Sequence, residues 1–173
     1  MLRGAIIGVV AVLMLLAVGG YAAVEMGAMP ANADGKPMRL ERWAARASLL
    51  ATLEREAPKT PNPVPLDDDN LIAGIKLYAQ NCAFCHGSSD ALRSRVAKGL
   101  YQKPPQLAKD GVEDDPAGVV YWKIAHGIRF TGMPAFGPSM TDRQLWQLTL
   151  FLQHMDGLPA APERLWKAVH VST

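Results

Sequence analysis

Two cysteines and a histidine stand together near the middle of the chain. The sequence there reads Cys82-Ala83-Phe84-Cys85-His86, a C-x-x-C-H arrangement, and it contains the chain's only two cysteines. Thiols at this spacing can reach the two vinyl groups of one porphyrin and form thioether bonds. The next residue, His86, is then held beneath the ring, where its imidazole nitrogen can ligate the iron. The motif therefore predicts one covalently attached haem c, held by Cys82 and Cys85 and ligated by His86.

A C-x-x-C pair can also form a redox-active dithiol or part of a zinc site. A thioredoxin-like redox pair follows a strand and opens a helix, whereas here a predicted helix ends at the motif. A zinc site needs further cysteine or histidine ligands at suitable spacing, and His126, His154 and His170 are scattered. Haem attachment is the interpretation that the sequence favours.

The second axial ligand of the iron is sought downstream. A methionine thioether is a soft, neutral ligand that favours ferrous iron and raises the reduction potential. Met133 lies between a glycine and a proline, in a stiff loop that can present its sulfur. Met155 has the spacing of a helix core position, so packing is its expected role. Met140 lies just before a predicted helix and could make a capping contact there. His126 is the remaining alternative and would give an iron with two histidine ligands. We expect Met133 to be the ligand.

The segments around these residues read as helices. Acidic residues 67–69 supply N-cap and first-turn chemistry for a helix over residues 71–81 that leads into the motif. A second helix is predicted over 116–125, and a third begins after Thr141 and ends at Gly157. No alternating strand pattern of useful length is present, nor any internal repeat. The expected fold class is all-α.

With these residues placed, the segment 71–159, about half of the chain, resembles class I c-type cytochromes. This resemblance implies a small cytochrome c-like haem domain in which the first helix crosses the last one closely. The positions that carry it are the haem motif with Gly87, the loop Gly132-Met133-Pro134, the pair Gly74 and Tyr78, and the partner positions Leu148 and Phe151.

The resemblance also implies supporting roles around the haem. Pro104-Pro105 is similar to the loop whose proline carbonyl accepts the N–H of the proximal histidine, and Pro105 is the preferred candidate. Tyr121, Trp122 and Ile124 precede the methionine loop, where the family lines its pocket. They could equally be core residues of their helix.

The N-terminal region has the composition of a membrane segment. Residues 4–24 are 21 consecutive uncharged, mostly apolar residues, and a helix of that length spans about 30 Å, the thickness of a bilayer's hydrocarbon core. A cleaved signal peptide is the alternative, because Ala31-Asn32-Ala33 has the small-x-small pattern of a cleavage site. The apolar run is longer than a usual signal core, and that site lies well beyond its end. We therefore expect an uncleaved transmembrane anchor over residues 1–25.

A connector over residues 26–70 is expected between the anchor and the haem domain. It contains a predicted helix at about 38–57 and a proline-rich, semi-rigid spacer over 58–66. The helix either packs on its own domain or lies at the membrane surface or against a partner subunit. Residues 160–173 are expected to form a C-terminal tail. The apolar residues of the connector helix lie near one face: Leu40, Trp43, Ala47, Leu50 and Ala51.

These features predict an electron carrier and no enzyme. When both axial ligands stay bound, no position opens at the iron for a small-molecule substrate. An enzyme or gas sensor with five-coordinate haem would require that Met133 not bind the iron. A structural subunit would leave the activity of its complex unchanged when the haem ligand is altered. The net charge of +2 is close to balance and gives no indication of a nucleic-acid partner.

The expected location is the bacterial cytoplasmic membrane, with the haem domain on the periplasmic side, where haem is attached covalently. The basic residues Lys36, Arg39 and Arg42 after the anchor argue weakly against that orientation. Expected partners are the membrane and a redox protein such as a dehydrogenase, a quinol-oxidising complex, a terminal oxidase or a photosynthetic reaction centre.

Overall fold

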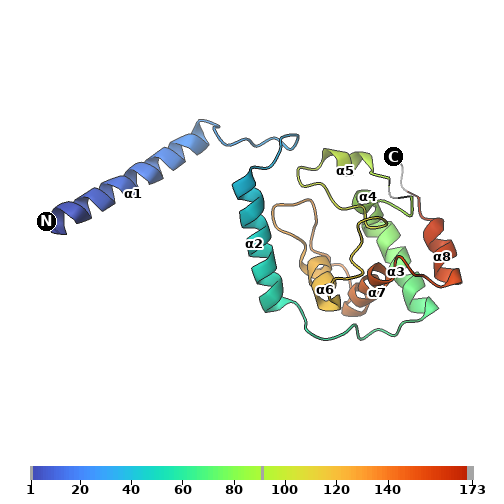
Figure 1. The fold of residues 1–173 in the computed structure, drawn as a ribbon. Helices are drawn as coiled ribbons and strands as arrows, with labels where there is room; N and C mark the ends of the chain where they lie inside the picture. Colours follow the sequence, from blue (N-terminus) through green and yellow to red (C-terminus); the bar gives the residue numbers. More distant parts are fainter. Residues whose placement is uncertain (1, 91, 171–173) are drawn as a thin grey trace. The chain divides into compact units, whose positions relative to one another are not determined.

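The computed structural model describes residues 2–90 and 92–170. It divides into two compact units, Met1–Gly35 and Lys36–Thr173. The described residues contain helices joined by loops and turns, and no strand (Figure 1). The predicted all-α fold class is thus confirmed for this part of the chain.

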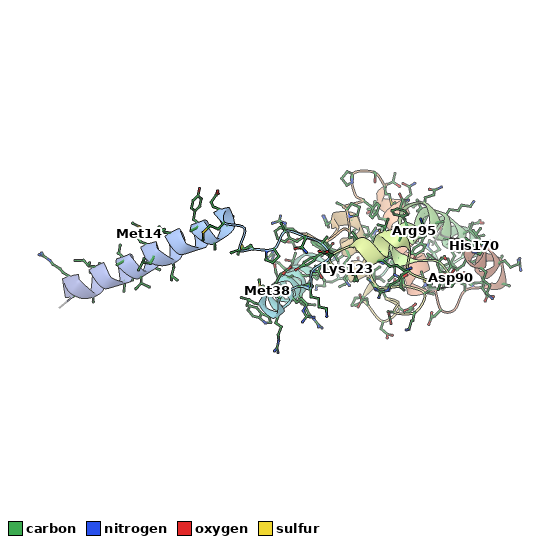
Figure 2. All side chains as sticks on the ribbon, turned by 90° about the horizontal axis from the view of Figure 1, so that it is seen from above. Met14, Met38, Asp90, Arg95, Lys123 and His170 are labelled. Carbon is green, nitrogen blue, oxygen red and sulfur yellow. The ribbon has the colours of Figure 1, made fainter. Side chains whose placement is uncertain are left out.

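The first unit is built around one long helix, α1 (Leu2–Glu25). None of its residues is buried, and its apolar side chains, Met14 among them, project from the helix into open space (Figure 2). The mean hydropathy of its most apolar 18-residue window is 2.4. Its length and composition allow it to cross a membrane, two criteria that a signal sequence also meets.

The core of the second unit forms where α3 (Asp68–Asn81) crosses α7 (Asp142–Gln153). The crossing is close because Gly74 has no side chain: a Cβ there would lie 2.3 Å from the carbonyl oxygen of Gln147. Tyr78 and Phe151 are fully buried beside it, with ring centroids 5.5 Å apart in an edge-to-face arrangement. The crossing thus has the form that the resemblance implied.

The ends of these helices follow from their capping residues. The side chain of Asp67 accepts a hydrogen bond from the backbone N–H of Asn70 at 2.8 Å, so α3 begins three residues earlier than predicted. Thr141 and Gln144 form a reciprocal capping box at the start of α7. That helix ends at Gln153, before the predicted Gly157, because residues 154–156 turn away from the helix axis.

The C-terminal segment is part of the core. Residues 160–173, expected to be a tail, contain α8 (Ala160–Lys167). Trp166 on this helix is only 5% exposed. Its ring meets Tyr78 and Phe151 edge to face, with centroids 5.3 and 5.2 Å apart. Burial of Trp166 and of Pro162 ties this short helix to the core.

The connector also belongs to the second unit. Its helix α2 (Arg39–Glu56) lies against α6 (Ala117–His126) (Figure 1). Beyond α2, the carbonyl of Pro58 approaches Gly118 so closely that a Cβ there would lie 1.8 Å from it. Asn62 donates a hydrogen bond to the carbonyl of Trp146 at 3.0 Å, and Val64 is buried. The expected spacer is therefore extended and packed on the domain, and the unit boundary falls at residue 35 rather than near 70.

Candidate haem-binding site

The C-x-x-C-H motif forms a single helical turn, α4 (Ala83–His86), directly after α3. The backbone N–H of Cys82 bonds the carbonyl of Tyr78, and the N–H of His86 bonds the carbonyl of Cys82, both at 2.8 Å. The turn ends at Gly87, whose φ of +80° is a conformation that glycine adopts without strain. The buried hydroxyl of Tyr78 donates to the carbonyl of Gly87 at 2.8 Å. A single core residue of α3, Tyr78, thus bonds both ends of the motif.

Cys82, Cys85 and His86 all line one cavity of about 340 Å³. The motif forms one wall, and the loop over residues 100–107 continues it. The other walls come from α6, from the loop that contains Met133, and from Leu152 on α7. Leu49 of α2 also lines the cavity.

The ring of His86 is oriented by Pro105. The Nδ1 atom of His86 lies 3.0 Å from the carbonyl oxygen of Pro105. A carbonyl oxygen can only accept, so Nδ1 carries the proton and Nε2 keeps its lone pair. Burial lowers the pKa of His86, and the hydrogen bond to Pro105 partly offsets this effect. The ring is therefore neutral at pH 7, which is the form that binds a metal.

The two thiols are not poised for thiolate chemistry. Burial, together with the neighbouring Cys85, raises the pKa of Cys82 to about 12, and burial also raises the pKa of Cys85. Redox pairs of the thioredoxin kind have lowered thiol pKa values. In addition, the described residues contain no group of three or more His, Cys, Asp and Glu side chains that could hold a metal ion. Neither alternative to haem attachment gains support from these observations.

The loop that contains Met133 is fixed to the C-terminal end of α6. Gly127 ends α6 with a φ of +66°, and a Cβ there would lie 2.6 Å from the carbonyl carbon of Pro134. The backbone N–H of Ile128 donates to the carbonyl of Met133 at 3.2 Å, and the N–H of Phe136 donates to the carbonyl of Ile124 at 3.1 Å. These contacts hold Met133 at the cavity wall.

The other ligand candidates lie elsewhere. Met155 is buried in the core cluster. Met140 and His126 line a second, more open cavity on the other side of α6. The ring of His126 packs on Trp122, with centroids 4.9 Å apart. Among the described methionines, Met133 alone lines the cavity that contains the motif.

The structure does not bring Tyr121 and Trp122 to the cavity. Tyr121 stacks on Trp146 at 4.2 Å and donates a hydrogen bond to Asp142 at 2.6 Å. That hydrogen bond, together with burial, raises the pKa of Tyr121 to about 12. Because successive residues of a helix are rotated by about 100°, the cavity-facing positions of α6 are instead Val120, Lys123 and Ile124.

Several cavity residues were missed by reasoning from the sequence. Lys123 lines the cavity while its ammonium pairs with Asp115 at 2.7 Å. Leu49 and Leu100 come from segments outside the recognised motifs. Only the four-residue spacing of Leu49 and Leu53, typical of one helix face, could have pointed to a packed side of α2.

The residues present fit a covalently bound haem. Two thiols, a neutral imidazole with a free nitrogen lone pair, and a thioether all border one cavity, and aliphatic side chains make up most of the rest of its wall. This donor set, one nitrogen and one thioether, is that of the cytochromes c.

Comparison with known proteins agrees with this geometry. Residues 69–152 match the family model described as cytochrome C oxidase, cbb3-type, subunit III. The chain is 27% identical over 135 residues to the cbb3-type cytochrome c oxidase subunit FixP of Sinorhizobium medicae (strain WSM419). The aligned part covers 71% of this chain and 44% of that relative, so the chain spans less than half of the relative's length. No solved structure matches the chain.

The all-helical fold and the family match support the resemblance to class I c-type cytochromes, whose domains carry covalently bound haem c and transfer electrons. Within that class, residues 69–152 are similar to subunit III of the cbb3-type oxidases. These similarities agree with the predicted class and with the predicted role in electron transfer.

Proposed function

We propose that this chain is a membrane-tethered electron carrier with a single haem c. In this proposal Cys82 and Cys85 form the thioether bonds, and His86 and Met133 are the axial ligands. One observation carries it above all: both thiols, the oriented imidazole and the methionine loop border the same cavity. Pro105 is the residue that orients the imidazole, through its carbonyl.

The bound haem would supply reversible one-electron chemistry between ferric and ferrous iron. The chain's own residues set the conditions for it. His86 is held neutral and in one orientation, Met133 would offer a soft ligand that favours the ferrous state, and the mostly apolar wall of the cavity would limit contact with water. With His86 and Met133 on the iron, no coordination position is left for a substrate.

The proposed partner is a terminal oxidase of the cbb3 type. This rests on the family match and on the similarity to FixP, which is itself named as an oxidase subunit. The helix α1 would hold the chain in the bacterial cytoplasmic membrane as an uncleaved anchor. The haem domain would then lie on the periplasmic side, because covalent haem attachment takes place there.

The first experiment tests the haem and its number. The full chain, produced in a strain that matures c-type cytochromes, should have the mass of the polypeptide plus one haem after denaturation. The double variant Cys82→Ser/Cys85→Ser should lose that added mass. An unmodified wild-type mass, or the mass of two haems, would contradict the proposal.

The second experiment tests the partner and the anchor. The chain should purify from its native membrane with the subunits of a terminal oxidase, and its N-terminal sequence should begin before residue 4. Purification with a dehydrogenase or a reaction centre instead would assign another partner. An N-terminus near Asp34 would show that α1 had been removed.

A further inference from the structure

The helix α2 is fixed to the haem domain by one of its faces. Leu49 lines the cavity of the haem site, and Leu53, one turn later, is buried. Near the start of the helix, the hydroxyl of Tyr101 donates a hydrogen bond to Glu41 at 2.7 Å. At its end, Ala57 is buried. The inward face of α2 therefore closes one side of the haem cavity.

The opposite face of α2 is apolar and open. Leu40 is 71% exposed, Trp43 is 67% exposed and Leu50 is 55% exposed. Ala47 and Ala51 lie between them and are also exposed. The spacing of these residues left open whether they pack on their own domain or meet a membrane or a partner subunit, and the domain packs against the other side of the helix. We call Leu40, Trp43, Ala47, Leu50 and Ala51 the outer face.

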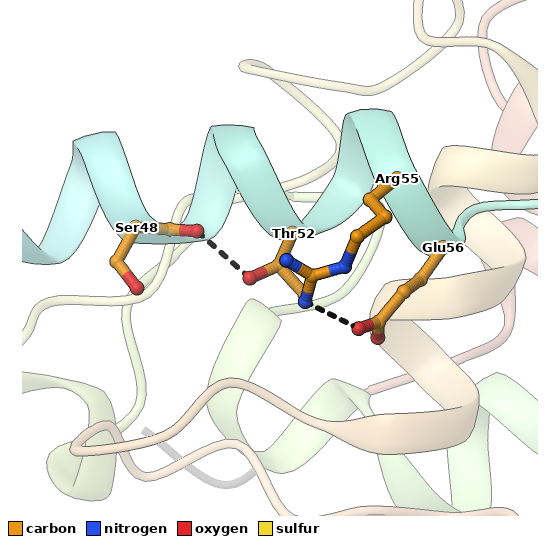
Figure 3. Close-up of polar contacts among 4 residues, drawn as sticks. All are labelled: Ser48, Thr52, Arg55 and Glu56. Carbon is orange, nitrogen blue, oxygen red and sulfur yellow. Dashed lines mark hydrogen bonds and ion pairs between the residues drawn. The ribbon is translucent and has the colours of Figure 1, made fainter.

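Polar contacts of α2 do not cover the outer face. Thr52 donates a hydrogen bond to the carbonyl of Ser48 at 2.9 Å, and Arg55 pairs with Glu56 at 2.7 Å, so both contacts stay within the helix (Figure 3). Exposed apolar side chains that lie next to one another on a stable helix indicate a surface that meets an apolar phase or a partner.

A row of arginines runs along one edge of the outer face, in line with Leu49 and Leu53. Arg39, Arg42 and Arg46 are all exposed and lie in the first half of α2. None of them forms an ion pair with another described residue. A helix that combines tryptophan and leucine on one side with arginines beside them has the composition of a helix that lies in a membrane interface.

We propose that the outer face of α2 lies in the surface of a membrane that contains anionic lipids. The inference goes beyond the proposed function and rests on its membrane anchor. Residues 26–38 join α1 to α2, and even fully extended they reach at most about 45 Å. If α1 spans a membrane, α2 stays near its surface, where anionic headgroups complement the arginines.

The arrangement has a consequence for the haem. Because α2 separates the outer face from the cavity, contact of this face with lipid turns the cavity side of the domain toward the membrane. The haem would then lie close to the surface in which membrane-embedded redox partners are held. A free-floating domain on a tether would have no such preferred orientation.

The test uses the full haem-loaded chain in lipid nanodiscs. A spin label is attached at residue 47 in an Ala47→Cys variant and, as a control, at residue 69 on α3 in an Asp69→Cys variant. Collisions with oxygen, which concentrates in lipid, are compared with collisions with a water-soluble nickel chelate. In discs with phosphatidylglycerol, the oxygen-to-nickel ratio should be severalfold higher at residue 47 than at residue 69.

Charge and lipid provide the second comparison. The ratio at residue 47 should fall in discs of phosphatidylcholine alone, and equally in the variant Arg39→Gln/Arg42→Gln/Arg46→Gln, whose fold is checked by its haem spectrum and thermal melting.

Water-like ratios at residue 47 in both lipids would overturn the inference while leaving the anchor intact. Exclusion of both reagents in both lipids would show a protein, such as a second copy, on the outer face, and would overturn it too. A chain that does not enter the discs would refute the anchor itself.

Discussion

Replacement of Trp166 by alanine tests whether the C-terminal helix is part of the haem domain. Trp166 is 5% exposed and meets two other buried rings edge to face. Truncation of a buried tryptophan costs about 3–5 kcal/mol, which includes the cavity that it leaves. Domains have net stabilities of about 5–15 kcal/mol, so Trp166→Ala should remove a large fraction of the total.

The expected change in melting temperature follows from the size of the unit. Globular proteins gain about 2.1 cal/mol/K of unfolding entropy per residue. For the roughly 140 residues of the second unit, the loss of 1 kcal/mol lowers the melting temperature by about 3–4 °C. Trp166→Ala should therefore lower it by about 10–17 °C.

The assay is thermal melting of the full haem-loaded chain in detergent, followed by its absorbance and circular dichroism. The matched control is Trp43→Ala, which removes the same side chain from a position that is 67% exposed. It should change the free energy of unfolding by no more than about 0.5 kcal/mol. Equal melting temperatures for the two variants would refute the argument that α8 completes the core.

Three further predictions concern the ligand, the helix crossing and alkaline pH. Met133→Ala should abolish the near-infrared sulfur-to-iron band, open the iron to carbon monoxide and lower the reduction potential, whereas Met140→Ala should do none of these; a band that survives in Met133→Ala would exclude this ligand. Gly74→Ala should destabilise the domain by about 1–3 kcal/mol in urea unfolding, because its Cβ would meet the backbone of α7, and Gly99→Ala, with open space around it, should not. Because the pKa of Tyr121 is raised from 10.0 to about 12, its contribution to stability is complete below pH 10 and is lost as the pH rises toward about 12. Stability measured across that window should fall less steeply in Tyr121→Phe, and an unchanged slope would contradict the assigned cause.

The chemistry proposed for the site could be inferred because it is local in the sequence. Thioether attachment and proximal ligation require contiguous residues, so five neighbouring positions carry that proposal. Met133 could be proposed because its glycine and proline neighbours define a loop. Gly74 and Tyr78 followed from their offsets before Cys82, and the structure places them at the crossing of α3 and α7.

The rotation of a helix about its axis could not be predicted from the same information. In α6, Lys123 and Ile124 line the cavity, whereas Tyr121 and Trp122, which were predicted together with Ile124, do not. Because each residue turns the helix by about 100°, a shift of one position changes the whole set that faces the cavity. That rotation is determined by packing against α7 and α2, which the local pattern does not contain.

The packing of the connector and of the C-terminal segment could not be predicted for a related reason. The spacing of Trp43 and its apolar neighbours left open whether this face of α2 packs on its own domain or meets a membrane or a partner, and the domain buries Leu53 on the other side. In the tail, an eight-residue helix is too short to be stable alone. It forms because Trp166 fills a site between Tyr78 and Phe151, which are distant in the sequence. Both outcomes depend on surfaces that exist only after the rest of the domain has folded.

The residues around the cavity would act together on the reduction potential in one direction. Met133 would favour the ferrous state as a ligand. His86 bonds a neutral carbonyl and not a carboxylate, so no negative charge is passed to the imidazole. Leu49 and Leu152 contribute apolar surface to the cavity, and an apolar surrounding would penalise the extra positive charge of ferric iron. The ammonium of Lys123 would add to this effect, but its pairing with Asp115 at 2.7 Å cancels most of its field. Because Leu49 lines the cavity, α2, a segment outside the cytochrome motif, would take part in setting the potential. A change in how α2 packs would therefore alter the redox properties of the site without any change in its ligands.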